Sequence, residues 1–316
     1  MRILVTGCCG FIGSHLCEKL LIRGDDVHGI DILNDYYDVR QKKRNLDLLC
    51  GYENFHFYKE DLVSTNLISE LGPNVVVNLG AMAGIRYSIE NPEIYMRTNI
   101  EGQTHLLKEC VKNKVKLFVY ASSSSVYGLN SKIPFSETDS IDLANSPYAV
   151  SKKAGEDIAK LYNRLYKLKV IGLRFFTVYG PRGRPDMAPY KFLNAISCGK
   201  SIDKYGNGES LRDYTYIDDI INGIIGAINN KNNRTCEIYN LGNNKPISLN
   251  TFISACEKIT GKIALYIQKE EQLGDVPITY ADINKASSDL DYNPSINIEY
   301  GLKKMYEWMI CDCVCE

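Results

Sequence analysis

The chain has 316 residues, of which 45% are hydrophobic, so it can form one large domain or two smaller ones. Its 37 Lys and Arg residues balance 38 Asp and Glu residues, and a net charge of −1 offers nothing that attracts a polyanionic nucleic acid. No apolar run approaches the roughly 20 residues that a membrane span requires.

The first 180 residues alternate short apolar runs with longer helical patterns. Strands are predicted at residues 3–5, 27–30, 55–58, 75–79, 117–121 and 170–175, and helices at 11–23, 92–113 and 147–168. Residues 34–49 form a charged insertion with a helical pattern. This order predicts an α/β fold, a Rossmann-type doubly wound parallel sheet with helices on both faces.

The pattern becomes less regular after residue 180. A Gly- and Pro-rich loop at 180–186 is followed by predicted helices at 187–198, 218–229, 249–260 and 300–310 and by short strands at 201–205, 237–241 and 263–268. We therefore expect a dinucleotide-binding domain at 1–180 and a smaller C-terminal α/β lobe for substrate at 181–316, with the chain allowed to cross between them.

The 11 cysteines are odd in number and irregularly spaced, and no charged leader with a hydrophobic signal region precedes the first strand. We expect free thiols in a reducing, cytoplasmic compartment. The terminal Cys311-Asp312-Cys313-Val314-Cys315 fits no usual zinc spacing, so we expect no metal and a frayed tail without function.

Three glycines, Gly7, Gly10 and Gly13, lie between the first strand and the first helix. Missing side chains permit a tight turn and let a pyrophosphate approach the helix N-terminus. Asp31 ends the second strand, where a carboxylate can accept hydrogen bonds from the adenosine ribose and repel a 2′-phosphate, which favours NAD over NADP. A turn without ligand and an ordinary strand-end carboxylate remain the alternatives. Asn99 is a poor helix former in mid-helix, which indicates either a polar role near the nicotinamide or a surface position.

Tyr148 and Lys152 are four residues apart, so they share one face of a helix that Pro147 can begin. A tyrosine titrates near pH ~10, and a lysine ammonium together with a nicotinamide cation would lower that pKa enough for a base. Alone, the spacing also fits a surface pair. With the glycine turn and the serine run 122–125, it indicates a nicotinamide-dependent enzyme acting on an alcohol.

These motifs, with 173–181 (Leu-Arg-Phe-Phe-Thr-Val-Tyr-Gly-Pro) and 212–220 (Arg-Asp-Tyr-Thr-Tyr-Ile-Asp-Asp-Ile), resemble extended short-chain dehydrogenases/reductases that modify nucleotide sugars. Segments 83–92, 122–129, 183–188 and 274–282 are similar to UDP-glucuronate 4-epimerases. The resemblance implies bound NAD, a C-terminal lobe closing over a UDP-sugar, and a homodimer formed through helices 92–113 and 147–168.

The same resemblance implies a set of roles. Ser123, Tyr148 and Lys152 are the expected catalytic residues: Ser123 bonds the C4 hydroxyl, Tyr148 is the base, and Lys152 supports it and holds the nicotinamide ribose. The expected cofactor contacts are Gly7, Gly10, Phe11, Ile12, Gly13, Asp31, Asn34, Asp61, Leu62, Leu79, Ala81, Ala83, Asn99, Ser122, Tyr148, Lys152 and Phe175. The expected substrate contacts are Arg86, Ser123, Ser124, Ser125, Tyr148, Thr177, Arg184, Tyr205, Arg212 and Asp275.

Within that set, Arg212 would bind the diphosphate and Asp275 the uridine ribose. Two positions depart from the pattern of related chains. Leu273 replaces a usual proline, and Gln272 stands where UDP-glucose 4-epimerases carry a phosphate-binding arginine. The second departure leaves more of the diphosphate charge to Arg212.

The residues after Ser123 separate the reactions of this group. Sugar 4,6-dehydratases carry an Asp-Glu pair there and decarboxylases a glutamate, whereas this chain has Ser124 and Ser125, which favours 4-epimerisation. A 4-keto glucuronate can lose CO2, and Ser124, Ser125, Thr177 and Arg184 are the expected clamp on its carboxylate. A UDP-GlcNAc or UDP-glucose 4-epimerase, a loop-surface role for Arg184, a surface role for Arg86 and a non-catalytic NAD-binding module remain as alternatives.

Overall fold

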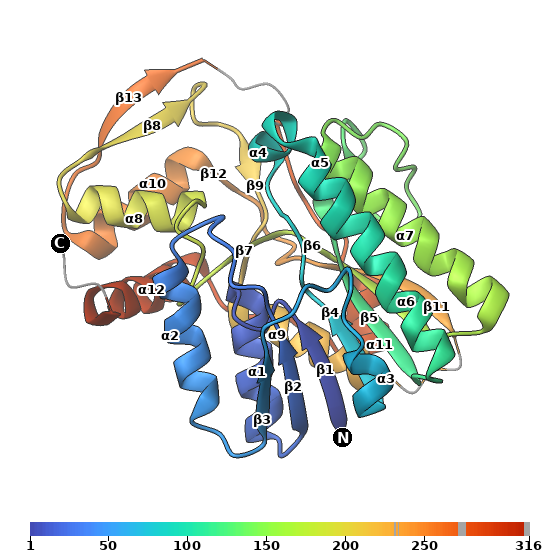
Figure 1. Cartoon of the computed structure of the whole chain (residues 1–316). Helices are drawn as coiled ribbons and strands as arrows, with labels where there is room; N and C mark the ends of the chain where they lie inside the picture. Colours follow the sequence, from blue (N-terminus) through green and yellow to red (C-terminus); the bar gives the residue numbers. More distant parts are fainter. Residues whose placement is uncertain (231, 233, 271–275, 313–316) are drawn as a thin grey trace.

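A seven-stranded parallel sheet forms the centre of the computed structural model, which describes residues 1–230, 232, 234–270 and 276–312 (Figure 1). The strand order is β3-β2-β1-β4-β5-β6-β11, so the direction of winding reverses between β1 and β4. A ligand binds outside the carboxyl ends of the strands at such a switch point. The strands are β1 (Arg2–Thr6), β2 (Asp26–Ile30), β3 (Phe55–Tyr58), β4 (Val75–Asn78), β5 (Leu117–Ser123), β6 (Val170–Phe175) and β11 (Cys236–Leu241).

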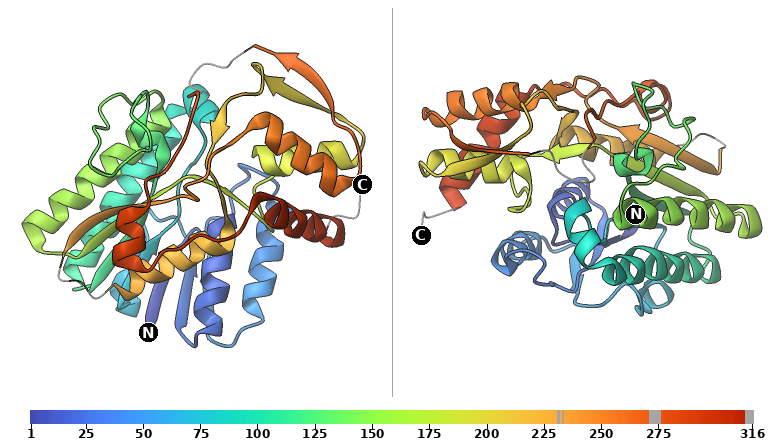
Figure 2. Two further views of the ribbon diagram at one scale, coloured as in Figure 1. Left: turned by 180° about the vertical axis from the view of Figure 1, so that it is seen from behind. Right: turned by 90° about the horizontal axis from the view of Figure 1, so that it is seen from above.

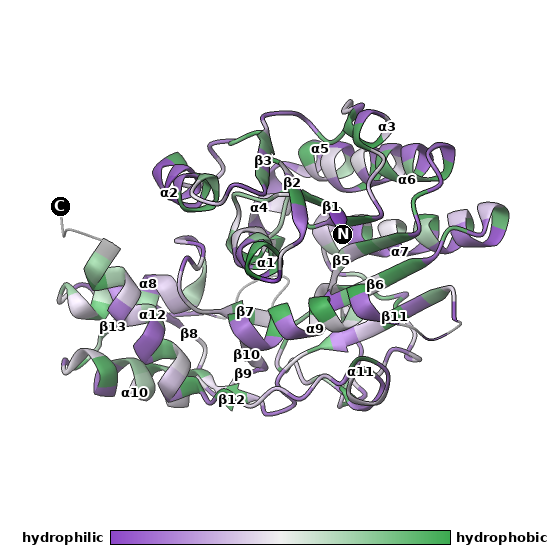
Figure 3. Ribbon diagram, turned by 90° about the horizontal axis from the view of Figure 1, so that it is seen from below, coloured by the Kyte–Doolittle hydropathy of each residue, from purple (hydrophilic) through white to green (hydrophobic). Residues whose placement is uncertain are grey.

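Helices cover both faces of this sheet, which confirms the predicted Rossmann-type fold (Figures 1 and 3). Strands such as β4 and β6 are largely apolar because both of their faces are buried, with Arg174 as the charged exception in β6. One face carries α3 (Leu67–Leu71), α5 (Pro92–Tyr95), η1 (Met96–Gly102), α6 (Gln103–Lys112) and α7 (Pro147–Tyr166). The other carries α1 (Phe11–Ile22), α2 (Val39–Cys50), α9 (Ile217–Asn229) and α11 (Asn284–Leu290).

A smaller lobe lies beyond the carboxyl ends of the strands (Figures 1 and 2). It contains α8 (Ala188–Ser197), α10 (Leu249–Thr260), α12 (Ile298–Asp312) and four paired short strands, β8 (Ser201–Tyr205) with β13 (Leu265–Lys269) and β9 (Leu211–Arg212) with β12 (Ile247–Ser248). The parallel pair β7 (Thr177–Tyr179) and β10 (Tyr214–Tyr216) lies at the junction. After residue 180, β11, α9 and α11 return to the large sheet, so the chain crosses between the lobes. The division into two domains at residue 180 stays a prediction.

The helix predicted over 92–113 contains a π-helical segment, η1. Asn99 lies in it, and its side chain bonds the backbone of Met82 and the hydroxyl of Ser151. Gly102 meets Leu62 so closely that a Cβ there would lie 1.9 Å from Leu62 Cδ1. These contacts give the local wide turn a physical cause, and such turns often occur beside functional sites.

The first turn of α7 is fixed by its N-terminal cap. Before α7, Ser146 Oγ accepts a hydrogen bond from the Ala149 amide, and Pro147 begins the helix, which fixes the first turn that carries Tyr148.

In the described part of the chain, no helix has the length and hydropathy that crossing a bilayer would demand. Residues 313–316, with the tail cysteines 313 and 315, lie outside the described residues.

Candidate active site

A cleft of about 1480 Å³ lies at the carboxyl edge of the sheet and is lined by both lobes. It exceeds the roughly 300–1,000 Å³ of ordinary small-molecule sites, which suits a dinucleotide and a second nucleotide together. All of the predicted cofactor and substrate residues line it except Asn99 and Asp275. Asn99 is buried behind the wall, and Asp275, like Gln272 and Leu273, lies outside the described residues.

The glycine turn has the shape that a pyrophosphate requires. Gly7 adopts φ +69°, and a Cβ on it would lie 2.9 Å from Gly80 Cα. A Cβ on Gly13 would lie 2.0 Å from the Gly7 carbonyl oxygen, so α1 can pack against the turn only without that side chain. The turn leads directly into the N-terminus of α1, where backbone amides favour an anion. The residues present therefore fit a dinucleotide cofactor.

Asp31 lies at the end of β2 beside this turn. Its Oδ2 accepts from the Cys9 amide at 3.2 Å and its Oδ1 from the Leu33 amide at 2.8 Å, and burial raises its pKa. The Lys42 ammonium donates to the Asn34 carbonyl at 2.8 Å and is almost fully buried. Lys42 lines the cleft, but sequence reasoning did not identify it as a site residue, because nothing distinguishes it from its charged neighbours at 40–44.

The catalytic residues meet where β5 ends and α7 begins. The Ser123 side chain lies close enough to the Tyr148 hydroxyl to lower its pKa, and its Oγ accepts from the Ser125 amide at 3.1 Å. The Lys152 ammonium donates to the Ala121 carbonyl at 2.8 Å and lies 6.0 Å from the centre of the Tyr148 ring. The three residues thus form one group at the floor of the cleft.

Burial dominates the pKa values of Tyr148 and Lys152. Burial raises the pKa of Tyr148, although Ser123 and Arg184 partly oppose the rise. Burial lowers the pKa of Lys152 to about 8, against the opposing charge of Glu156. The expectation that Lys152 and a nicotinamide cation together lower the pKa of Tyr148 concerns the cofactor-bound protein and stays a prediction.

A buried ion pair anchors α7 to the sheet beneath the catalytic residues. Arg174 Nε and Nη2 each donate to Glu156 at 2.8 Å, and their side chains are 2% and 0% exposed. Ser122 Oγ donates to the same carboxylate at 2.6 Å, and Arg174 Nη1 donates to Tyr127 Oη at 2.9 Å. Sequence reasoning missed Glu156, although its position four residues after Lys152 was a usable signal.

Arg184 lies in the cleft wall with its side chain 17% exposed, so it is not a solvated loop arginine. It pairs with Asp186 through Nε at 3.0 Å and Nη2 at 2.6 Å. Nη2 also donates to the Ala83 carbonyl at 3.1 Å and to Tyr36 Oη at 3.2 Å. Burial would lower the pKa of this guanidinium, but Asp186 keeps it above its ordinary value. Tyr36, which the sequence did not single out, therefore fixes Arg184 from the inserted segment before α2.

The other predicted substrate residues line the same cleft from both lobes. Arg86, at the start of α4 (Ile85–Glu90), places its guanidinium 5.0 Å from the centre of the Tyr205 ring at the end of β8. Arg212 Nη1 donates a hydrogen bond to the Leu211 carbonyl at 3.0 Å. The backbone amide of Thr177 donates a hydrogen bond to the Asp213 carbonyl at 3.1 Å. The ligand contacts of all these residues stay predictions.

Comparison with known proteins finds relatives along nearly the whole chain. The family described as GDP-mannose 4,6 dehydratase matches residues 4–305. Protein CapI of Staphylococcus aureus is 44% identical over 98% of both chains, and UDP-glucuronate 4-epimerase 2 of Arabidopsis thaliana is 42% identical over 98% of this chain and 76% of its own.

A solved structure shares the architecture as well. UDP-glucuronic acid 4-epimerase from Bacillus cereus, in complex with UDP-glucuronic acid and NAD, superposes with a TM-score of 0.95 at 37% identity. The match covers 99% of this chain and 100% of that one.

Proposed function

We propose that this chain, which belongs to the GDP-mannose 4,6-dehydratase family of extended short-chain dehydrogenases/reductases, is an NAD-dependent UDP-sugar 4-epimerase that interconverts UDP-glucuronate and UDP-galacturonate. The observation that carries the proposal is the joined group of Ser123, Tyr148 and Lys152 at the floor of a cleft wide enough for two nucleotides. A module that only sensed or displayed NAD would not need this base.

The positions after Ser123 support epimerisation over the reaction in the family's name. Water elimination requires an acid and a base beside the sugar. Here Ser124 and Ser125 occupy those positions, and Ser125 Oγ accepts a hydrogen bond from Ser123 Oγ at 3.1 Å. Hydroxyls of this kind can orient a substrate, but they lack a carboxylate's basicity.

The chain's own residues then have defined tasks. Tyr148 takes the proton of the C4 hydroxyl and later returns it, while Ser123 holds the oxygen at C4 and Lys152 the nicotinamide ribose. A bound NAD would supply the reversible hydride chemistry at C4, as acceptor when oxidised and as donor to the opposite face when reduced. Every electron and proton is returned, so the reaction needs no external oxidant.

Arg184 supports glucuronate as the sugar. Its partly buried guanidinium faces the same cleft as Ser124, Ser125 and Thr177, and a charge-assisted hydrogen bond to the C5 carboxylate would restrain it at the 4-keto stage. Such restraint matters because a β-keto acid loses CO2 when its carboxylate bond aligns with the carbonyl π-system. One observation favours a neutral sugar instead: Asp186 already balances the charge of Arg184. UDP-GlcNAc or UDP-glucose is therefore the second candidate substrate.

Separate incubations with UDP-glucuronate, UDP-GlcNAc and UDP-glucose, followed by NMR of the products, test the assignment. We expect UDP-galacturonate to form with the largest kcat/KM. A larger kcat/KM for UDP-GlcNAc or UDP-glucose would refute the glucuronate assignment and leave the epimerase. A 4-keto-6-deoxy product or a UDP-pentose as the main product would refute the epimerase.

A homodimer and a cytoplasmic location are further parts of the proposal. Exposed apolar residues on α7, namely Val150, Leu161, Leu165 and Tyr166, support pairing of this helix with a second copy. The nine cysteines among the described residues are free, which supports a reducing compartment. Light scattering coupled to size exclusion tests the dimer, and Leu161→Glu with Leu165→Glu should yield a monomer.

A further inference from the structure

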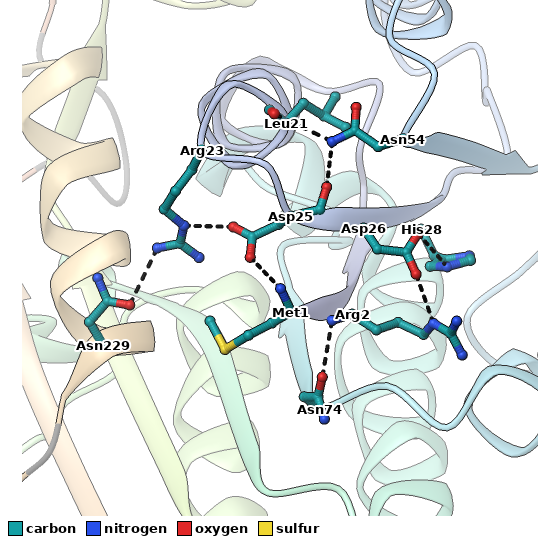
Figure 4. A network of polar contacts seen from close by, with 10 residues as sticks. All are labelled: Met1, Arg2, Leu21, Arg23, Asp25, Asp26, His28, Asn54, Asn74 and Asn229. Carbon is teal, nitrogen blue, oxygen red and sulfur yellow. Dashed lines mark hydrogen bonds and ion pairs between the residues drawn. The ribbon is translucent and has the colours of Figure 1, made fainter.

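Three potential metal ligands gather on β2 and β3, toward the amino ends of these strands and away from the cleft. The parallel register places His28 opposite His56. Side chains two residues apart on a strand point to the same face, so Asp26 joins the two imidazoles. Figure 4 shows Asp26 between Arg2 and His28, next to the chain's N-terminus.

The distances suit a single ion. His28 Nε2 and His56 Nε2 each lie 3.3 Å from Asp26 Oδ1, and the three ligand atoms lie within 4.8 Å of one another. Ligand atoms about 2.0–2.1 Å from a tetrahedral ion are separated by roughly 3.3–3.4 Å. Small rotations of the side chains would therefore complete the geometry.

His28 gives an independent indication of a ligand. The residue is only 5% exposed, and its buried Nε2 makes no well-aligned hydrogen bond among the described residues, with Asp26 Oδ1 at 3.3 Å as an ion-pair contact. Its Nδ1 is hydrogen-bonded to Tyr58 Oη at 3.1 Å, the outer-sphere arrangement that commonly orients a metal-binding histidine. His28 Nε2 therefore faces the same carboxylate oxygen as His56 Nε2, and a metal ion at this point would replace the imidazole protons.

Arg2 holds one oxygen of the Asp26 carboxylate and leaves the other free of that arginine. Arg2 Nε donates to Asp26 Oδ2 at 2.9 Å, which leaves Oδ1 for the ion. The positive charge of Arg2 opposes a second cation, so the two imidazoles and the carboxylate must supply the affinity.

We propose that Asp26, His28 and His56 bind one divalent transition-metal ion of the zinc, nickel and copper class. Imidazole with a carboxylate is a usual ligand set for these ions, and water would complete the coordination. The ion would join β2 to β3 and would enter from solvent, since the side chains of His56 and Asp26 are 47% and 37% exposed. This site is remote from the cleft and does not depend on the proposed reaction.

Zinc added to the NAD-loaded full chain in phosphate-free buffer tests the proposal. The chain has only four histidines, so two-dimensional 1H–15N spectra of the imidazoles can separate His28 and His56 from His15 and His105. We expect the first two to shift with one equivalent of zinc and the melting temperature to rise with zinc concentration. His56→Gln should weaken binding by at least about 10-fold and remove the thermal shift. Glu53→Gln, at an exposed site just before β3, is the matched control and should bind as wild type does.

Either of two results would overturn the site. Equal zinc affinity in wild type and His56→Gln would assign binding elsewhere, for example to the buried group of Cys8, Cys9 and Asp31, which contains no histidine. Unchanged imidazole signals at millimolar zinc, with His28 and His56 still titrating against pH, would show that these side chains bind protons and no metal ion. Because His56 is exposed and NAD content reports folding, a misfolded variant would be recognised.

Discussion

The buried pair of Glu156 and Arg174 permits a prediction that links stability to catalysis. Glu156→Gln removes the charge that balances Arg174, whose guanidinium donates two hydrogen bonds to the carboxylate at 2.8 Å. Because the two side chains are 0% and 2% exposed, the arginine is left as an uncompensated buried cation. Breaking such a pair costs about 3–5 kcal/mol of unfolding free energy.

The same substitution acts on Lys152. Burial lowers the pKa of Lys152 to about 8, and Glu156 is the neighbouring charge that opposes the fall. Without Glu156 the pKa should fall further, so that the ammonium, and with it activity, is lost at a lower pH. The alkaline limb of kcat/KM against pH should therefore move to lower pH.

Urea denaturation and the pH profile measure the two effects. Asp157→Asn is the matched control, because Asp157 is the next residue on α7 and forms an exposed pair with Lys160 at 3.8 Å. It should change the unfolding free energy by less than about 0.5 kcal/mol. A Glu156→Gln protein that loses under about 1 kcal/mol and keeps its alkaline limb would refute this reasoning, because it would show that the pair is neither uncompensated nor coupled to Lys152.

Four further predictions concern the cleft. Tyr148→Phe should lower kcat by ~100- to 10,000-fold while the protein still binds NAD and UDP-sugar, measured by turnover and by titration of both ligands; near wild-type kcat would exclude this base. Arg184→Ala should lower UDP-glucuronate turnover by about 10- to 100-fold, far more than turnover of neutral UDP-sugars, and should release UDP-4-keto-pentose and NADH; an equal effect on every sugar would contradict the clamp. Tyr36→Phe, which removes the hydroxyl that holds Arg184 Nη2, should show the same selectivity with a smaller loss, and its absence would separate Tyr36 from the clamp. The purified protein should contain tightly held NAD, and Asp31 should make NADP+ a poor substitute; better activity with NADP+ than with NAD+ would overturn that assignment.

The sequence was sufficient for the sheet and the catalytic turn because their signals are local. Apolar runs identified the main strands, and the Tyr148–Lys152 spacing needed only a helix to become a shared face. The seventh strand was predicted at 237–241, but its place beside β6 depends on long-range pairing that periodicity does not encode.

What the sequence left out was decided by packing between distant segments. The π-helical segment follows from contacts of Asn99 with Met82 and Ser151. Tyr36 and Arg184 are 148 positions apart and meet only in the folded chain. The spacing of Tyr148 and Lys152 indicates a nearby ammonium but says nothing about burial, which raises the pKa of Tyr148 in the chain by itself.

Following a deuterium label tests the central claim most directly. UDP-glucuronate deuterated at C4 is incubated with the purified chain in ordinary water, and the product is analysed by NMR and mass spectrometry. If NAD takes the C4 hydride and returns it within the cleft, UDP-galacturonate should form with the deuterium retained at C4. A product that has lost the label to water, or one that has lost its carboxylate, would contradict the account.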